Sequence, residues 1–263
     1  MPTFNDYGIV LHSYKLSESG KILNIYTKDH GLIKAVYKST KTAKSSFRGK
    51  FDQLSCCYFQ FAIGKSLYTI CECEQINSFS LLRSNLVNLS AGILFLEIIN
   101  SFSHEGEIDS IHTYNLLYSS LDKLQTNNEP DLLIVDFMIE FLSIHGYKPQ
   151  LETCVSCSTV ISWDRDVARN VSTAQSSIPY SSILGGLLCI ACSETLDHKM
   201  VHSETLELLQ LLTTNSKSSN IETLHSPTFE AKGNIRSVLK LLREHLDLRA
   251  KNKIKSFDLL LSL

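Results

Sequence analysis

The chain has 263 residues, of which 43% are hydrophobic, and a formal net charge of −2 at pH 7. This length and composition support one large globular domain or two ordinary ones with real cores. No apolar run approaches the roughly 20 residues that cross a bilayer, and the opening MPTFNDYGIV lacks the basic start and apolar stretch of a signal peptide. We therefore expect a cytoplasmic protein.

The small net charge conceals a strong segregation of charge along the sequence. Residues 1–80 hold ten Lys and Arg against six Asp and Glu, whereas residues 81–231 hold seven against eighteen. Residues 232–255 reverse the sign again, with eight basic side chains against two acidic ones. Such segregation attracts polyanions to the two ends of the sequence and repels them from its middle.

The first eighty residues are expected to form about five short strands, because β-branched and aromatic residues partly alternate with polar ones. The expected strands are GIVLHSYKL (8–16), KILNIYTKDHG (21–31), LIKAVYKS (32–39), QLSCCYFQFAIG (53–64) and SLYTICECEQI (66–76). The triplets at 29–31 and 64–66, Asp-His-Gly and Gly-Lys-Ser, are hairpin signals. Five short strands suit a small closed barrel, either the OB-fold, which often binds nucleic acids, or an SH3-like barrel.

From residue 81 the apolar residues follow helical spacing, with stripes at 86–100 and 111–124. The sequence therefore predicts an α+β protein in which a barrel domain at 1–80 precedes a mainly helical domain at 81–263. A third helix is expected after Pro130, with Asp131 as its cap and Gly146 just beyond its end.

Two more helices are expected near the end of the chain. Ser203 would cap a helix that runs to residue 214. The segment GNIRSVLKLLREHLDLRAKN (233–252) predicts a final helix of about five turns. Three of its basic residues share one face, which would meet a polyanion, an acidic partner peptide or only solvent; they are Arg236, Lys240 and Arg243.

Two Cys-x-x-Cys pairs predict a metal site; they are Cys154-Cys157 and Cys189-Cys192. Each pair presents two thiolates from a tight turn, and two facing turns complete the four-sulfur tetrahedron that zinc prefers. The 31 intervening residues exceed the common spacing, and Gly185 and Gly186 would allow the backbone turn that ligation needs. Redox disulfides and unrelated buried thiols are the alternatives. Because four cysteines leave no open position, we expect one structural zinc per chain, in a zinc finger at about 150–196.

The remaining cysteines and the histidines show no catalytic pattern. Burial in the barrel is expected for the other four cysteines, with a second metal site as the alternative, and the last two would share one strand face; they are Cys56, Cys57, Cys71 and Cys73. No GxxxxGK[ST] or GxGxxG motif is present, and neither cysteine pair has the preceding proline of the Pro-Cys-x-x-Cys arrangement that zinc deaminases use. We therefore expect no enzymatic activity.

The segment 38–50, KSTKTAKSSFRGK, has five basic residues and no acidic one. Its Ser, Thr and Gly content favours a mobile loop that can follow a phosphate backbone, and a solvated basic surface is the alternative. Four aromatic residues would either stack on bases of a single strand or form the barrel core; they are Tyr26, Tyr37, Phe47 and Phe59.

Three blocks of the sequence resemble one family. The first, GIVLHSYKLSESGKILNIYTKDHGLIKAVYKSTKTAKSSFRG (8–49), resembles the opening of RecO proteins, the bacterial mediators of DNA repair and recombination. The second, GYKPQLETCVSC (146–157) with its return GGLLCIAC (185–192), is similar to the zinc knuckle of that family. The third, LREHLDLRAKNKIKS (242–256), is similar to its terminal helix. The three blocks occur in the family's order over nearly the whole chain.

The resemblance implies an OB-fold joined to a helical domain with a zinc finger, which binds single- and double-stranded DNA without enzymatic turnover. RecO-like proteins anneal complementary strands and, with the partner RecR, help to load the recombinase RecA onto DNA coated by single-stranded DNA-binding protein, whose acidic tail they bind. The implied DNA-binding residues are Lys34, Lys38, Lys41, Lys44 and Arg48, and the implied zinc ligands are Cys154, Cys157, Cys189 and Cys192.

We therefore expect a recombination mediator that is cytoplasmic and associated with the nucleoid when active. A zinc-containing protein-interaction adaptor without a direct DNA role is the alternative. In that reading the acidic helices meet a basic partner, and DNA binding is incidental.

Overall fold

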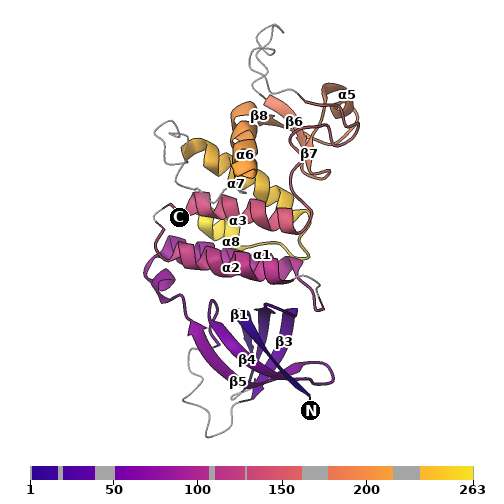
Figure 1. The fold of residues 1–263 in the computed structure, drawn as a ribbon. Coiled ribbons are helices and arrows are strands. Elements are labelled where there is room, and N and C mark those ends of the chain that lie inside the picture. Colours follow the sequence, from indigo (N-terminus) through magenta and orange to yellow (C-terminus); the bar gives the residue numbers. More distant parts are fainter. Residues whose placement is uncertain are drawn as a thin grey trace. The chain divides into compact units, whose positions relative to one another are not determined.

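The computed structural model describes residues 2–16, 20–38, 51–106, 110–127, 129–161, 177–215 and 232–262. The chain divides into two compact units, one of Met1–Pro130 with Ala250–Leu263 and the other of Asp131–Arg249. Figure 1 labels the elements of both units. Within the described ranges, no helix has the length and apolar character needed to cross a membrane. The sequence-based domain boundary near residue 80 stays a prediction.

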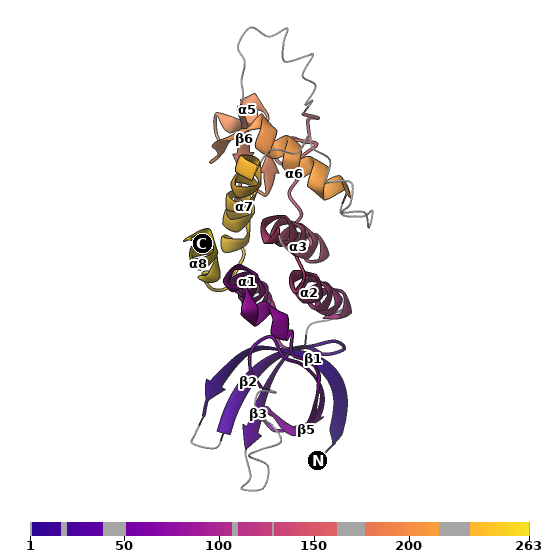
Figure 2. The same ribbon diagram turned by 90° about the vertical axis from the view of Figure 1, so that its left-hand side faces the viewer.

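Five strands of the first unit close into a barrel in the order β1-β2-β3-β5-β4 (Figure 2). They are β1 (Thr3–Lys15), β2 (Gly20–Thr27), β3 (Gly31–Lys38), β4 (Cys56–Ala62) and β5 (Tyr68–Asn77). β3 and β5 pair in parallel, and the other neighbours pair antiparallel. The expected α+β fold with an N-terminal OB-like barrel is confirmed.

Three of the four aromatic residues that the sequence offered for base stacking are buried. Tyr26, Tyr37 and Phe59 are all buried, and the last two belong to one apolar cluster with Phe51 and Phe61. Their rings therefore stabilise the barrel and face no ligand. Phe47 lies outside the described residues.

A β-bulge overturns one expectation for the barrel cysteines. Cys71 is exposed, so its expected burial on the strand face of Cys73 is wrong. Gln60 pairs with Glu72 whereas Phe61 pairs with Ile70, which leaves Cys71 as the extra residue of the bulge. Because a bulge interrupts the alternation of faces, β5 turns this side chain outward. The other three are buried as expected; they are Cys56, Cys57 and Cys73.

Helical elements complete the first unit, and both views show two long helices lying across one end of the barrel (Figures 1 and 2). The elements are a 3-10 helix η1 (Ser80–Ser84), α1 (Leu86–Phe102), α2 (Ser110–Leu124) and α8 (Ser256–Ser262). Asn85 caps α1, since its side chain accepts the first free N–H groups of the helix. Asn24 of β2 donates to Asn100 of α1 at 2.9 Å, which ties this helix to the barrel.

One carboxylate of α1 holds the start of α8. Glu97 accepts the backbone N–H groups of Lys255 at 2.9 Å and Ser256 at 2.8 Å, and it also accepts the Ser256 hydroxyl. The first N–H groups of any helix lack partners within that helix, and the helix dipole favours negative charge there. Glu97 therefore caps α8 from a neighbouring helix.

The second unit combines helices with a small sheet of order β7-β6-β8. Its elements are α3 (Pro130–Ile144), β6 (Ser177–Ser181), β7 (Gly186–Leu187), α5 (Ile190–Ser193), β8 (Lys199–His202), α6 (Ser203–Asn215) and α7 (Lys232–Asp247). α3 ends before Gly146 as expected: this glycine has φ of 75°, and the next N–H, of Tyr147, donates to Leu142 O at 2.7 Å. Asp131 lies within the first turn and is not the cap, because the helix begins at Pro130.

The expected final helix through residue 252 is wrong in its end. α7 stops at Asp247, and α8 follows as a separate helix. The guanidinium of Arg249 donates to the carbonyls of His245 at 2.8 Å and Ser182 at 3.1 Å. The bond to Ser182 is tertiary and favours the end of α7 at this point, and sequence periodicity does not reveal it.

We predict that Glu97→Gln lowers the free energy of unfolding by about 1–2 kcal/mol, because a neutral amide oxygen accepts hydrogen bonds more weakly than a carboxylate. Urea unfolding at pH 7 measures this change. Glu74→Gln, on the exposed surface of β5, is the matched control and should stay within about 0.5 kcal/mol of the parent protein. Equal effects of the two substitutions would contradict the capping role.

Candidate metal centre and basic surface

The first cysteine pair lies on a tight turn after α3. Thr153 and Val160 form an isolated antiparallel bridge at its base, and the Cys154 N–H donates to Thr159 O at 2.8 Å. The Ser158 N–H closes the turn by donating to Cys154 O at 2.9 Å. This closure brings the two ends of the Cys154–Cys157 segment together.

The second pair follows strand β7. Cys189 precedes the single turn of α5, and the N–H of Ser193 donates back to Cys189 O at 3.0 Å. The two turns are joined through β7, because Val155 N–H donates to Leu187 O at 2.9 Å. A Cβ at Gly186 would lie 2.7 Å from Val155 Cγ1, so only glycine permits this approach.

The structure brings all four predicted metal ligands together. Their sulfur atoms lie within 4.8 Å of one another, and Cys157 Sγ is 3.6 Å from Cys189 Sγ. A zinc–sulfur bond of about 2.3 Å in a tetrahedron separates neighbouring sulfurs by about 3.8 Å. All four cysteines are free thiols in the structure. The donor set therefore fits a tetrahedral metal ion.

Hydrogen bonds to sulfur lower the pKa of two of these thiols. Burial raises the pKa of Cys154, but backbone N–H groups of Cys157, Cys189 and Ser156 lower it to about 6. Hydrogen bonding to Thr159 lowers the pKa of Cys157. Four thiolates this close repel each other, so a divalent cation is needed before all four can ionise together.

A four-cysteine set leaves no open coordination position, so a metal held here has no site for an activated water molecule. Among the residues that the structure describes, no second group of three or more His, Cys, Asp or Glu gathers closely enough to hold a metal. The described residues therefore give no support to the alternative of a second metal site at the barrel cysteines.

A buried histidine holds the neighbouring β6–β7 turn against α7. His245 Nε2 donates to Tyr147 O at 2.8 Å, so its Nδ1 accepts from the Tyr180 hydroxyl at 3.1 Å. Gly185 of the turn, with φ of 87°, lies against this ring. Burial, and then the charge of Arg249, lower the pKa of His245 to about 4. The histidine is therefore neutral at pH 7.

The lowered pKa of His245 predicts a pH dependence of stability. A histidine in the unfolded chain has a pKa near 6.5. Between pH 6.5 and about 4, residue 245 is therefore protonated in the unfolded chain but stays neutral in the folded one. The contribution of neutral His245 to the stability of the folded state is therefore complete above pH 6.5 and declines as the pH falls from 6.5 to about 4. We predict that His245→Gln lowers the free energy of unfolding at pH 7.5. It should also reduce the loss of this free energy on acidification by up to about 1 kcal/mol per pH unit. Chemical denaturation at several pH values between 4 and 7.5 measures both effects.

The exposed His104 provides the control for this measurement. His104→Gln should leave both the stability at pH 7.5 and the slope unchanged. An unchanged slope in His245→Gln would show that another group titrates in this window.

The predicted DNA-binding residues lie on and after β3. Lys34 is half-exposed on that strand, with Nζ 3.6 Å from a carboxylate oxygen of Glu105. Lys38 is the last residue of β3. The other three, Lys41, Lys44 and Arg48, lie outside the described residues. The five assignments stay predictions.

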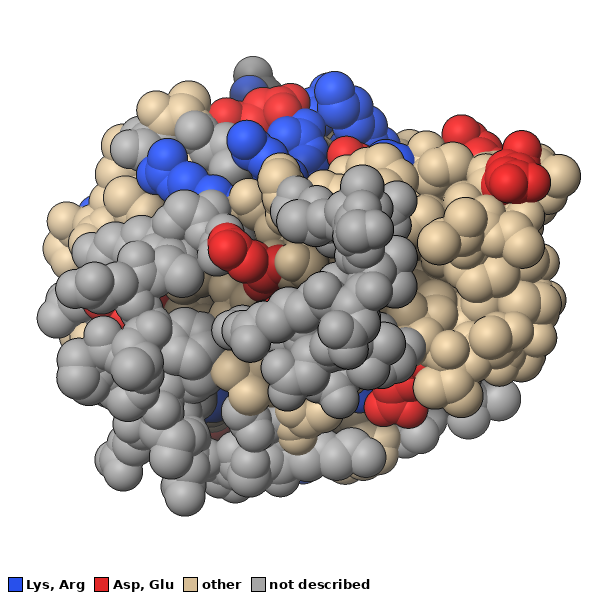
Figure 3. Space-filling view, turned by 90° about the horizontal axis from the view of Figure 1, so that it is seen from above, with Lys and Arg blue, Asp and Glu red and all other residues tan. Residues whose placement is uncertain are grey.

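One cation on the basic face of α7 is paired within the helix, since Arg243 Nε lies 3.5 Å from Asp247 Oδ2. Glu244 of the same helix pairs instead with Lys199 of β8. Figure 3 shows a face on which Lys and Arg side chains gather beside Asp and Glu. Arg236 and Lys240 are exposed, whereas Val238, Leu239 and Leu242 on the apolar side of the helix are buried.

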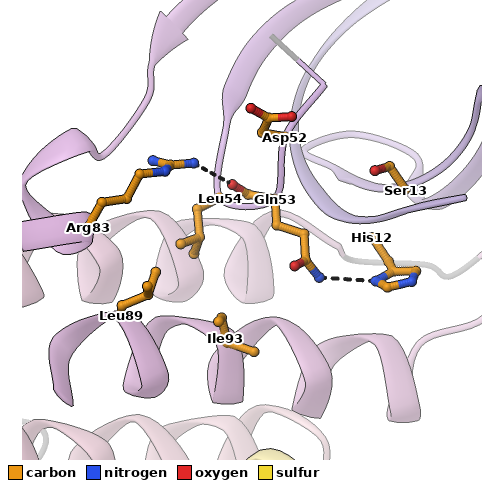
Figure 4. A pocket seen from close by; sticks show the side chains of 8 residues that line it. All are labelled: His12, Ser13, Asp52, Gln53, Leu54, Arg83, Leu89 and Ile93. Atoms are coloured by element: carbon orange, nitrogen blue, oxygen red, sulfur yellow. Dashed lines mark hydrogen bonds between the residues drawn. The ribbon is translucent and has the colours of Figure 1, made fainter. Parts of the chain in front are cut away.

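Sequence reasoning missed a pocket of the first unit, with a volume of about 410 Å³. Figure 4 shows its lining side chains, which come from β1, the segment before β4, η1 and α1. Its polar side chains include His12, Gln53 and Arg83. No single stretch of sequence contains this combination, so no motif could have revealed it.

Comparison with known proteins covers both parts of the chain. Residues 1–79 match the family described as "Recombination protein O N terminal", and residues 83–256 match "Recombination protein O C terminal". A "DNA repair protein RecO" of Dehalococcoides mccartyi (strain CBDB1) is 30% identical over 244 residues, which span 90% of this chain and 91% of that protein. One of Rubrobacter xylanophilus is 32% identical over 60% of this chain and 63% of its own length. One of Alkaliphilus metalliredigens is 30% identical over 70% of each.

Proposed function

Because the chain belongs to the RecO family of DNA repair proteins, we propose that it is a DNA-binding recombination mediator without enzymatic activity. The family match over both parts of the chain carries this proposal. The OB-like barrel supports this proposal, since such barrels commonly bind single-stranded nucleic acids. The closed cysteine cluster also suits a structural role better than a catalytic one.

In this function the protein binds single- and double-stranded DNA and anneals complementary strands. With RecR it assists the loading of RecA onto DNA coated by single-stranded DNA-binding protein, whose acidic tail it also contacts. It acts in the bacterial cytoplasm, at the nucleoid. The charge segregation supports this proposal, since basic segments at 38–50 and 232–255 flank an acidic middle and would direct polyanions toward themselves.

The direct test uses complementary single strands that are already coated with single-stranded DNA-binding protein. The purified chain should accelerate their annealing, and addition of RecR should increase the amount of RecA bound to the coated strand. Absence of both effects, with DNA binding and folding intact, would contradict the mediator function.

We propose that Lys34, Lys38, Lys41, Lys44 and Arg48 contact the DNA backbone. Each phosphate that they neutralise releases condensed counterions, so the affinity should fall steeply with salt concentration. The triple substitution Lys38→Ala, Lys41→Ala and Lys44→Ala should make the slope of log affinity against log salt shallower by about 2 for a single strand. Fluorescence anisotropy with labelled oligonucleotides at several salt concentrations measures this slope.

A control of equal charge change alters lysines in the acidic middle of the chain, namely Lys123→Ala, Lys148→Ala and Lys199→Ala. It should leave the slope within the error of the parent protein. Equal slopes for the parent protein and the first triple variant would refute the assignment of the 38–50 segment. DNA binding too weak to measure in the parent protein would favour the alternative function, a zinc-containing protein-interaction adaptor.

We also propose that the metal is one structural zinc ion, held by Cys154, Cys157, Cys189 and Cys192. The sulfur separations and the closed donor set support zinc. Cys189→Ser should remove about one zinc per chain and lower the melting temperature while annealing is retained, because a structural metal contributes its binding energy to folding. Elemental analysis and thermal unfolding measure the two effects.

Cys71→Ser is the matched control, since this exposed thiol lies on β5 and outside the cluster. It should keep both the metal and the melting temperature. Retention of the full metal content in Cys189→Ser would refute the four-thiolate site. Loss of annealing in a variant that stays folded would instead assign the metal a direct role in activity.

A further inference from the structure

We propose that the pocket formed by His12, Gln53 and Arg83 receives one base of single-stranded DNA, with Tyr14 as a stacking surface at its edge. This inference rests on the proposed DNA-binding function and adds a subsite that takes the base instead of the phosphate. The lining of the pocket includes none of the five basic residues proposed to contact the DNA backbone.

The pocket has the size and the floor that a nucleobase requires. Its volume of about 410 Å³ admits a flat ring system together with part of its sugar. Leu54, Leu89 and Ile93 form the apolar lining, and Figure 4 shows the last two below the Gln53 side chain. The face of a base is apolar and its edge is polar, so an apolar floor with polar groups around it matches both.

The hydrogen bonds of Gln53 fix the donors that the pocket offers. Its amide nitrogen donates to Leu11 O at 3.0 Å, which sets the orientation of the amide. The same nitrogen lies 3.0 Å from His12 Nδ1, so this ring nitrogen accepts and the proton of the neutral ring resides on Nε2. Figure 4 shows Gln53 between the Arg83 guanidinium and the His12 ring. The pocket therefore combines N–H donors with an amide oxygen, and base edges carry complementary groups.

The charge around the pocket also favours a nucleotide. Arg83 is exposed and is anchored by hydrogen bonds to Ser78 O at 2.9 Å and Gln53 O at 3.0 Å. The one lining carboxylate, Asp52, lies 4.0 Å from Lys21 Nζ, which offsets its charge. A phosphate next to the bound base would therefore meet a cation held in place by the fold. Asp52 and Gln53 also follow the basic segment 38–50 almost directly in the sequence.

Tyr14 gives the site an exposed aromatic ring. Its side chain is 49% exposed, and its ring centroid lies 4.3 Å from that of His12 in an edge-on arrangement. Tyr26, Tyr37 and Phe59, three of the aromatic residues singled out from the sequence, are buried, whereas Tyr14 is accessible to a base. Stacking on such a ring tolerates every base, as a protein that binds any sequence requires.

The test compares a normal oligonucleotide, oligo-dT, with one of equal length in which the bases are replaced by abasic tetrahydrofuran sites. Tyr14→Ala should weaken binding of oligo-dT about 5- to 30-fold, because one stacking contact is lost, and should barely change binding of the abasic strand. Tyr14→Phe keeps the ring and should bind both strands as the parent protein does. Melting temperatures verify that each variant is folded.

Tyr7→Ala is the matched control, since Tyr7 also lies exposed on β1 (43%) and has an aromatic neighbour, Tyr58, at 4.8 Å. It should bind both strands normally. If the parent protein binds oligo-dT and the abasic strand equally, or if Tyr14→Ala and Tyr7→Ala behave alike, the base subsite is refuted while DNA binding stands. If the parent protein binds neither strand, the proposed function itself fails.

Discussion

The first unit depends on one strand that pairs with two partners. β1 pairs through its first half with β4 and through its second half with β2, and Gly8 pairs with both Cys57 and Thr27 where the partners overlap. A Cβ on Gly8 would lie 2.5 Å from Ile25 Cγ2, so the two neighbouring strands can close around this point only because the residue lacks a side chain. Closure of the barrel in turn sets where His12, Tyr14 and the end of β3 lie.

Local patterns were sufficient for much of the fold. Alternation in 8–76 predicted five strands, and helical spacing predicted α1, α2, α3 and α6, because each of these elements buries one face that its own sequence marks. The failures have tertiary causes. A bulge placed by pairing with β4 turned Cys71 outward, and contacts of Arg249 with another segment accompany the early end of α7. Neither cause is encoded within the segment that was mispredicted.

The candidate sites also differ in whether a local sequence pattern marks them. The cysteine pairs were visible because metal ligation imposes a spacing within each turn, and the fold only had to bring Cys154–Cys157 and Cys189–Cys192 together. The pocket at His12, Gln53 and Arg83 had no such signal, since its residues are joined only by packing and by the hydrogen bonds of one amide. The basic segment was visible as charge, yet Lys34 shows that a lysine next to the segment can already face a carboxylate, that of Glu105. Counting cations therefore overstates the charge that is free for DNA.

The cap that Glu97 provides for α8 joins the two segments of the first unit, Met1–Pro130 and Ala250–Leu263. The unit of Asp131–Arg249 is thus an insertion: the chain leaves the first unit after Pro130 and returns to it at Ala250. During synthesis the barrel strands, α1 and α2 emerge before α8, so the surface of α1 that binds α8 stays uncovered until the residues after Ala250 leave the ribosome. The first unit can therefore be completed only after the second unit, including the cysteine turns, has been translated.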